Sequence, residues 1–309
     1  MMSSRFLPKE NSFALLSFDG LGDFVSTAIG KCESNTVEIL DRVTFPHSLG
    51  HFYNAITLYL GFHHFGEEFK VMGLSSFGKP AYASAFKELV REREPWGFEL
   101  NLEAFPPVAN AKSMRIENAQ PRILPFYNAN ILTQMFGLAP RRPTDPLTQK
   151  HSDLAKSLQV RFEEIATHLL HQLHKRFPTD TLALSGGCSH NSVWVGTIPK
   201  RTPFKHIHVA PASHDAGLSV GAAIFAAKNK VVPEGRSWAS LGPSGKEFTE
   251  GWNPTNFHEK KFRTQEQLVT FMAEQLAEEK IIGLFHGRME FGPRALGNRS
   301  ILCDPRKAA

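Results

Sequence analysis

Apolar residues recur every three or four positions over 152–177, which places them on one face of a helix. Ser152 is expected to cap that helix. Short apolar runs at 181–187 and 206–211 predict strands instead, and the first of them runs into a double glycine. An acidic loop followed by small residues at 212–228 predicts another helix. Strand, glycine turn, helix, strand, acidic loop and helix form an α/β arrangement, in which binding groups collect where the strands end.

The N-terminal part of the chain shows shorter patterns. Residues 11–26 predict a strand, a tight turn at Asp19-Gly20 and a second strand. Residues 45–62 predict a helix that begins after a proline. The stretch 95–150 is rich in proline and has little periodicity, so we expect an insertion with short elements.

Gly, Pro and Ser residues are frequent at 229–258 and predict a linker. A second unit is expected to follow, with a helix at 265–279, a buried strand at 280–285 and then a loop rich in glycine and arginine. The expected division of the chain is 1–235 for the first domain, 236–258 for the linker and 259–309 for the start of the second domain.

Composition narrows the class of protein. The 309 residues are 41% hydrophobic and 21% charged, which is ordinary for a globular protein. The net charge of +5 favours anionic ligands, but no basic run indicates a nucleic-acid arm. Three widely spaced cysteines form neither a disulfide framework nor a zinc cluster, so a cytoplasmic location is expected. Neither a signal peptide nor a membrane span is expected.

The double glycine after the predicted strand 181–187 is a candidate ligand site. Gly186 and Gly187 allow a close approach of the backbone to a nucleotide or anion, but they also fit a plain tight turn. Asn191 is a candidate for hydrogen bonding to a ribose or base, or it caps the next helix. Lys70 is a further cationic candidate, with a solvated surface lysine as the alternative.

Two aspartates follow predicted strands. If Asp19 and Asp215 converge on one cleft, their carboxylates are suitable ligands for a divalent metal ion, with His214 as an additional candidate. Each aspartate also fits an ordinary turn position.

The loop GRMEFGPRALGNRS at 287–300 contains three arginines, Arg288, Arg294 and Arg299, among three glycines. Guanidinium groups are planar, bidentate donors for phosphate or carboxylate, and glycines let the chain fold around such a ligand. Glu290 is expected to pair with one of the arginines. We interpret this loop as a phosphate site; the alternative is a solvated surface loop.

Several motifs together resemble those of the O-carbamoyltransferases that act in antibiotic tailoring and nodulation-factor decoration. The motifs occur in the family's order and cover nearly the whole chain, least securely at 95–150. They are FPHSLG (45–50), EFKVMGL with Gly78 (68–78), LSGGCSHN (184–191), HDAG (214–217), LGP (241–243) and GRMEFGPRALGNRSILCDPR (287–306).

The resemblance implies two domains. The first is similar to the universal tRNA threonylcarbamoyl transferase and has the actin/hexokinase-like fold, and the second resembles the small α/β domain that forms threonylcarbamoyl adenylate. It also implies that carbamoyl phosphate and ATP form carbamoyl adenylate, whose carbamoyl group passes to a hydroxyl of a sugar or other natural product. The implied cofactors are Mg²⁺ and Fe²⁺, and the resemblance admits a homodimer.

The motifs assign functional residues to positions of this sequence, with Lys70 added as the cationic candidate from its own motif. These are Asp19 and Asp215 for the metal, Gly186, Gly187, Asn191 and Lys70 for the nucleotide, and Arg288 and Arg294 for the phosphate of carbamoyl phosphate.

The chain departs from the family pattern at both ends. A His-x-x-x-His segment is expected before the strand that ends at Asp19, and the second domain is expected to continue beyond DPRKAA. Cys188 and His190 also stand where small or apolar residues are expected. The sequence therefore predicts a shortened carbamoyltransferase. The alternative is a non-catalytic nucleotide-binding remnant of the actin/hexokinase-like superfamily, and a tRNA-modifying threonylcarbamoyl transferase is the third candidate.

Overall fold

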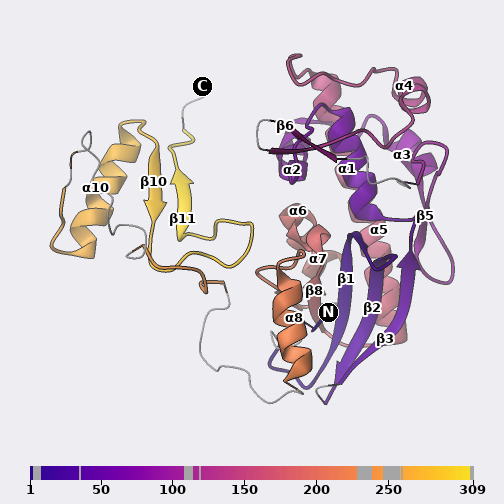
Figure 1. Ribbon diagram of the computed structural model, residues 1–309, viewed down its shortest axis with the longest axis horizontal. Helices are drawn as coiled ribbons and strands as arrows, with labels where there is room; N and C mark the ends of the chain where they lie inside the picture. Colours follow the sequence, from indigo (N-terminus) through magenta and orange to yellow (C-terminus); the bar gives the residue numbers. More distant parts are fainter. Residues whose placement is uncertain are drawn as a thin grey trace. The chain divides into compact units, whose positions relative to one another are not determined.

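The computed structural model describes residues 1–2, 8–34, 36–107, 114–117, 120–227, 239–245, 258 and 260–306. The chain forms two compact units, Met1–Val231 and Val232–Ala309, which Figure 1 colours indigo to orange and yellow. The fold is mixed α/β. The predicted linker 236–258 lies mostly outside the described residues, so the predicted domain boundaries stay predictions.

A five-stranded sheet organises the first unit, in the order β3-β2-β1-β8-β9. The antiparallel strands β1 (Ser12–Gly22), β2 (Val25–Glu33) and β3 (Thr36–Thr44) adjoin the parallel strands β8 (Thr181–Ser185) and β9 (His206–Val209). The strands predicted at 181–187 and 206–211 are confirmed. The middle strand β1 is buried on both faces, which explains its continuous apolar run.

The turn of the first hairpin was predicted at the wrong place. The chain reverses at Asp23 and Phe24, both with positive φ (49° and 63°), whereas the expected turn at Asp19-Gly20 lies within β1 at an irregularity in its pairing with β2. Positive φ at two consecutive residues suits the twist of a tight hairpin. The Asp-Gly pair instead packs closely against helix α1 (Leu49–Tyr59). The approach is so close that a Cβ at Gly50 would lie 2.6 Å from the backbone nitrogen of Gly20.

Two long helices cover one face of the sheet. Helix α1 (Leu49–Tyr59) confirms the helix predicted at 45–62, and α5 (Gln149–Arg176) confirms the one predicted at 152–177. The N-cap of α5 is Thr148, whose backbone N–H donates to Nδ1 of His151 at 3.0 Å, so the predicted cap at Ser152 was wrong by one turn.

Aromatic packing ties α5 to the sheet. The ring of Phe18 in β1 stacks on Phe162 of α5, with centroids 6.0 Å apart, and meets the ring of Trp194 edge-on at 5.2 Å. All three side chains are almost fully buried. Truncation of a core phenylalanine to alanine costs about 3–5 kcal/mol, so Phe18→Ala and Phe162→Ala are each expected to destabilise the unit by about this amount.

Shorter elements complete the first unit, and several lie in the region where the sequence predicted an insertion of short elements. They are α2 (Glu68–Leu74), α3 (Ala83–Leu89), β4 (Val90–Glu92), β5 (Phe98–Leu100), β6 (Met114–Glu117), β7 (Gln120–Ile123), α4 (Ala129–Phe136), the 3₁₀ turn η4 (Gly187–His190), α6 (Ser192–Val195), α7 (Ile198–Arg201) and α8 (Gly217–Ala226).

The second unit contains α10 (Gln265–Ala277) and the antiparallel strands β10 (Ile282–Phe285) and β11 (Arg299–Leu302). The helix and the first strand were predicted, but the strand was wrongly expected to be buried. Within the predicted strand, Ile281 is 74% exposed and Phe285 is 46% exposed. The apolar pattern predicted burial wrongly here, because the described residues of this unit cover these two side chains only in part.

None of the helices in the described ranges is long and apolar enough to cross a membrane.

Candidate functional site

The double glycine of the first unit lies directly against Phe18 and Asp19, within β1. A Cβ at Gly186 would stand 2.1 Å from the carbonyl oxygen of Phe18, and the φ of Gly186 is +87°. A Cβ at Gly187 would stand 2.9 Å from Oδ1 of Asp19. The two glycines are therefore required by close packing between β1 and the turn after β8, and this packing brings the Asp19 carboxylate to the turn.

Helix α1 holds the backbone of Asp19 from the other side. The hydroxyl of Ser48, the N-cap residue of α1, donates to the carbonyl oxygen of Gly20 at 2.5 Å and to that of Asp19 at 3.2 Å. The ring of His51, one turn into α1, lies beside Gly20. Desolvation lowers the pKa of His51, and the negative charge of Asp19 opposes this shift. The sequence reasoning missed His51, although the start of a helix in HSLGH was a usable signal.

The loop that carries Asp215 is joined to the same turn. The N–H of Gly186 donates to the carbonyl oxygen of Ser213 at 2.7 Å, two residues before Asp215. The hydroxyl of Ser213 lies 3.2 Å from Nε2 of His190, whose ring centroid is 5.6 Å from that of His214. The ends of β1, β8 and β9 thus bring the segments of both predicted metal-ligand aspartates to the glycine turn, as expected for parallel strands.

Two buried polar atoms near this turn have no hydrogen-bond partner within the described ranges. They are Oγ of Ser185, directly before the double glycine, and Nδ1 of His214. Buried polar groups are normally paired, so such atoms fit a place where a ligand or water binds.

The side chains present do not form a complete metal centre. Among the described residues, no group of three or more His, Cys, Asp or Glu side chains is placed to hold a metal ion. The donor set therefore does not fit iron as it stands. The metal-binding role of Asp19 and Asp215 stays a prediction.

The predicted nucleotide residues Asn191 and Lys70 both have structural partners. Asn191 caps α6 through the N–H of Trp194 and exchanges two hydrogen bonds with the amide of Gln159, at 2.9 and 3.0 Å. Lys70 forms an ion pair with Glu67, at 2.5 Å. Their proposed contacts with a nucleotide stay predictions.

The arginine loop of the second unit is paired with the segment 239–245. The N–H of Gly242 donates to the carbonyl oxygen of Met289, and the N–H of Met289 donates to that of Pro243, at 2.9 Å each. The guanidinium of Arg288 donates to the carbonyl oxygens of Gly242 and Leu241, at 2.8 and 3.1 Å. Arg288 thus helps to fold the loop, and its proposed contact with phosphate stays a prediction. Arg294 is half-buried in the same loop, and its proposed phosphate contact also stays a prediction.

Glu290 organises this loop from inside, and its expected pairing with an arginine is confirmed by an ion pair with Arg299 at 3.1 Å. Its Oε1 accepts hydrogen bonds from the N–H groups of Leu296 and Asn298, at 2.6 and 2.8 Å. Desolvation works against ionisation of Glu290, yet these two backbone N–H groups hold its pKa below the ordinary value. Since Arg299 also donates to the carbonyl oxygen of Gly292, it closes the loop rather than being one of its outward donors.

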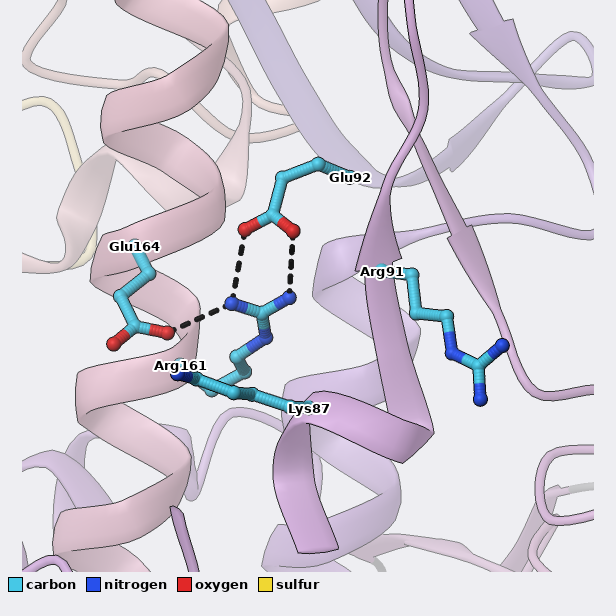
Figure 2. Close-up of a pocket in the computed structure, with 5 residues that line it drawn as sticks. All are labelled: Lys87, Arg91, Glu92, Arg161 and Glu164. Carbon is cyan, nitrogen blue, oxygen red and sulfur yellow. Dashed lines mark hydrogen bonds and ion pairs between the residues drawn. The ribbon is translucent and has the colours of Figure 1, made fainter. Parts of the chain in front are cut away.

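A cavity of about 360 Å³ lies elsewhere in the first unit, lined by none of the predicted site residues. Figure 2 shows Arg161 of α5 between the carboxylates of Glu92 and Glu164 in this cavity. Arg161 is 4% exposed and its guanidinium donates to Glu92 through two nitrogens, at 2.9 and 3.1 Å. These contacts hold β4 on α5, so we assign them to the stability of the fold.

Comparison with known proteins decides the family. Residues 1–224 match the model of the carbamoyltransferase N-terminus, and residues 273–309 match that of the carbamoyltransferase C-terminus. The chain belongs to the carbamoyltransferase family. The motif resemblance is thereby confirmed, and the Asp19–Gly187 contact and the arginine loop lie in the parts that match the N-terminal and C-terminal models, respectively.

Several curated proteins are similar over most of this chain. Nodulation protein NolO of Bradyrhizobium diazoefficiens is 34% identical over 95% of the chain and 50% of the relative. An uncharacterized protein of Synechocystis is 32% identical over 98% of the chain and 49% of the relative. The 3'-hydroxymethylcephem-O-carbamoyltransferase of Streptomyces clavuligerus is 26% identical over 76% of the chain and 38% of the relative. The chain thus spans about half the length of the first two relatives.

Proposed function

We propose that this protein is an O-carbamoyltransferase that takes a carbamoyl group from carbamoyl phosphate, with ATP, and transfers it to a hydroxyl of a sugar or other natural product. The observation that carries the proposal is the close approach of the Asp19 carboxylate to the double-glycine turn, where a Cβ at Gly187 would lie 2.9 Å from Oδ1, in a segment matched by the family's N-terminal model. The actin/hexokinase-like fold of the first unit is part of the same proposal.

The reaction has two steps. Carbamoyl phosphate, ATP and water give carbamoyl adenylate, pyrophosphate and phosphate. The acceptor oxygen then attacks the carbamoyl carbon, its proton passes to a base, and AMP leaves. We assign the first step to the second unit, in which Arg294 is to hold an anionic oxygen of the substrate.

The residues of the first unit serve the second step. Gly186 and Gly187 let the turn after β8 pack closely against Phe18 and Asp19 of β1, and this packing holds the Asp19 carboxylate beside the turn to which the donor is to bind. Mg²⁺ is the ion expected to accompany ATP. The iron assigned by resemblance would supply a Lewis acid near Asp19 and Asp215, but the described ligand set does not fit it.

Pyrophosphate release tests the proposal on the full chain. The assay contains ATP, Mg²⁺ and carbamoyl phosphate without an acceptor. We expect release that depends on carbamoyl phosphate and falls at least tenfold in Arg294→Ala. The matched control is Arg263→Ala, which removes an exposed arginine of the same unit and is expected to retain activity.

The alternative is a nucleotide-binding protein without catalysis. ATP binding together with no pyrophosphate release in any variant would favour that alternative. Equal release with and without carbamoyl phosphate would contradict both the substrate and the reaction that we propose.

A further inference from the structure

The ring of His51 is held beside the segment that carries Asp19. Its Cδ2 and Nε2 atoms lie 3.4 Å from the point that a Cβ at Gly20, the next residue after Asp19, would occupy. Helix α1 approaches this segment so closely that a Cβ at Gly50 would stand 2.8 Å from the carbonyl oxygen of Asp19. The first turn of α1 is thus packed on the backbone of β1, and the imidazole that follows has a fixed place next to the candidate site.

The polar atoms of Asp19 and His51 differ in how far the fold already uses them. Oδ1 of Asp19 accepts the N–H of Gly20 at 2.7 Å and lies against the turn at Gly187. Within the described ranges, neither ring nitrogen of His51 has a hydrogen-bond partner; its backbone N–H donates to Ser48. A neutral imidazole carries one lone pair that accepts a hydrogen bond. His51 therefore keeps an acceptor for a bound molecule.

A small hollow lies against His51. Its volume is about 10 Å³, which is roughly the space that one water molecule needs. Apolar side chains, among them Phe45, Leu100, Phe105 and Phe126, form the rest of its described lining, so His51 supplies the one polar side chain there. An oxygen in apolar surroundings is unfavourable unless it is hydrogen-bonded. The hollow therefore suits a single hydroxyl group or water molecule that donates to the imidazole.

Phe126 fixes the direction in which this imidazole points. Its ring meets that of His51 edge-on, with the centroids 5.7 Å apart and an angle of 62° between the planes. Aromatic pairs of this kind favour a defined mutual orientation. The ordinary pKa of histidine is about 6.5, so at a pH of about 8 the ring is neutral and able to accept a proton.

We infer that His51 is the catalytic base that takes the proton of the acceptor hydroxyl, and that Phe126 is the positioning residue that orients it. The inference rests on the proposed carbamoyl transfer. As the acceptor oxygen forms its bond to the carbamoyl carbon, the O–H bond breaks and the proton moves to Nε2 of His51. The bond between the carbamoyl carbon and AMP then breaks, and AMP leaves with the electron pair.

Two simple acceptors test this role without knowledge of the natural one. Water must lose a proton as it attacks, and its product decomposes to carbon dioxide and ammonia. Hydroxylamine attacks as a neutral amine and gives hydroxyurea, so it depends far less on a base. Both products are measured on the full chain with ATP, Mg²⁺ and carbamoyl phosphate, above the rate without protein.

His51→Gln keeps a polar side chain and removes the base. We expect it to lower ammonia release about 100-fold, because general-base catalysis contributes roughly 10²–10⁴-fold, and to leave hydroxyurea formation within about threefold. Phe126→Leu is expected to lower ammonia release about tenfold through misplacement of the ring, with the same selectivity. The matched control is His174→Gln, which removes a half-buried histidine that meets Phe204 edge-on at 5.6 Å and is expected to change neither product.

The outcomes separate the two proposals. If the unchanged protein makes neither pyrophosphate nor hydroxyurea, the proposed function fails and the inference fails with it. If the unchanged protein is active but His51→Gln keeps full ammonia release, or loses both products equally, the inference alone is overturned.

A second measurement tests the placement of His51 and needs no activity. The ring signals of the histidines are recorded by NMR on histidine-labelled protein, and His51→Gln identifies the signal of His51. Gly20→Ala places a methyl group against this ring and is expected to shift the signal. The matched control is Gly22→Ala in the same strand, where a Cβ meets nothing within 4 Å. A signal that Gly20→Ala leaves unchanged would contradict the placement on which the inference depends.

Discussion

Oδ1 of Asp19 lies 2.9 Å from the point that a Cβ of residue 187 would occupy, so the glycine at that position leaves room for the carboxylate. Asp19 lies within β1, and Gly187 begins the turn after β8. The two segments are far apart in the sequence, and the parallel pairing of β1 with β8 brings them together. Substitution of Gly186 is therefore expected to disturb the packing against the backbone of Phe18, and substitution of Gly187 the packing against the side chain of Asp19.

Gly186→Ala is expected to destabilise the fold more than Gly187→Ala. At position 186 the new Cβ meets the backbone oxygen of Phe18 at 2.1 Å, and its φ of +87° is strained for alanine. We expect a loss of about 3 kcal/mol or more from overpacking and strain together. At position 187 the obstacle is a side chain that is able to rotate, so we expect about 1 kcal/mol. Urea unfolding of both variants measures the difference, and equal losses would contradict it.

Replacement of Arg161 is expected to weaken the attachment of β4 to α5. Its guanidinium also donates to the carbonyl oxygen of Val90, at 2.7 and 3.1 Å, which alanine would leave unpaired. We expect Arg161→Ala to cost about 2–4 kcal/mol, because its carboxylate partners are partly exposed and are able to regain water. Arg161→Lys should recover less than half of this loss, since lysine lacks the two-pronged geometry.

The control for Arg161 is Arg201→Ala. Arg201 pairs with Glu163 at 2.8 Å but is 38% exposed in its side chain. Exposed pairs contribute about 0–1 kcal/mol, so thermal unfolding should show a small change. A loss as large as that of Arg161→Ala would show that burial does not decide the effect.

His47 is expected to make folding sensitive to mild acid. The N–H of Leu100 donates to Nδ1 of His47 at 3.1 Å, which requires that nitrogen to be unprotonated. Desolvation lowers the pKa of His47; Glu99 opposes the shift and Arg93 adds to it. Its stabilising contribution is therefore complete above the unfolded pKa of about 6.5 and is lost as pH falls through the lower folded pKa.

His47→Gln removes this titration and retains an oxygen that is able to accept the N–H of Leu100. The difference in unfolding free energy between the unchanged protein and the variant should shrink or reverse as pH falls from 7.5 to 5. A difference that stays constant over this range would argue against a neutral His47 in the fold.

Glu290→Ala is expected to loosen the arginine loop. It removes the acceptor for the N–H groups of Leu296 and Asn298 and the partner of Arg299. We expect hydrogen exchange at both amides to accelerate at least tenfold and trypsin cleavage after Arg294 to speed up. Glu290→Gln retains one acceptor oxygen, so its rates of exchange and cleavage should lie between those of the unchanged protein and of Glu290→Ala. Unchanged exchange in the alanine variant would refute the organising role of this carboxylate.

The regular elements were largely predictable because their apolar spacing reflects what they bury. The helix predicted at 152–177 and the strands at 181–187 and 206–211 were confirmed with small shifts of their ends. The hairpin turn at Asp23 and Phe24 was missed, since Asp19-Gly20 carries the stronger local turn signal. Tertiary packing of α1 against Asp19 decided that position, and no local pattern reports such a contact.

The candidate site was predictable only in part. Motif reasoning found Asp19 and the double glycine, which the fold brings together, but it assigned no base. Likewise, the spacing of the arginines gave no sign that Arg288 binds carbonyl oxygens of a distant segment. Contacts between residues that are far apart in the sequence produce no periodic pattern from which they could be predicted.

The place of β1 in the sheet also bears on the order in which the protein assembles. Ala14 pairs with Leu182, so the middle strand meets its parallel neighbour only after the segment from β2 to α5 has been made. During synthesis, the hairpin of β1 and β2 therefore remains with one edge of β1 unpaired and with both apolar faces of β1 exposed to solvent. Contacts of such wide sequence separation are slow to form. A nascent chain of this protein therefore depends on protection from aggregation until α5 and β8 have left the ribosome.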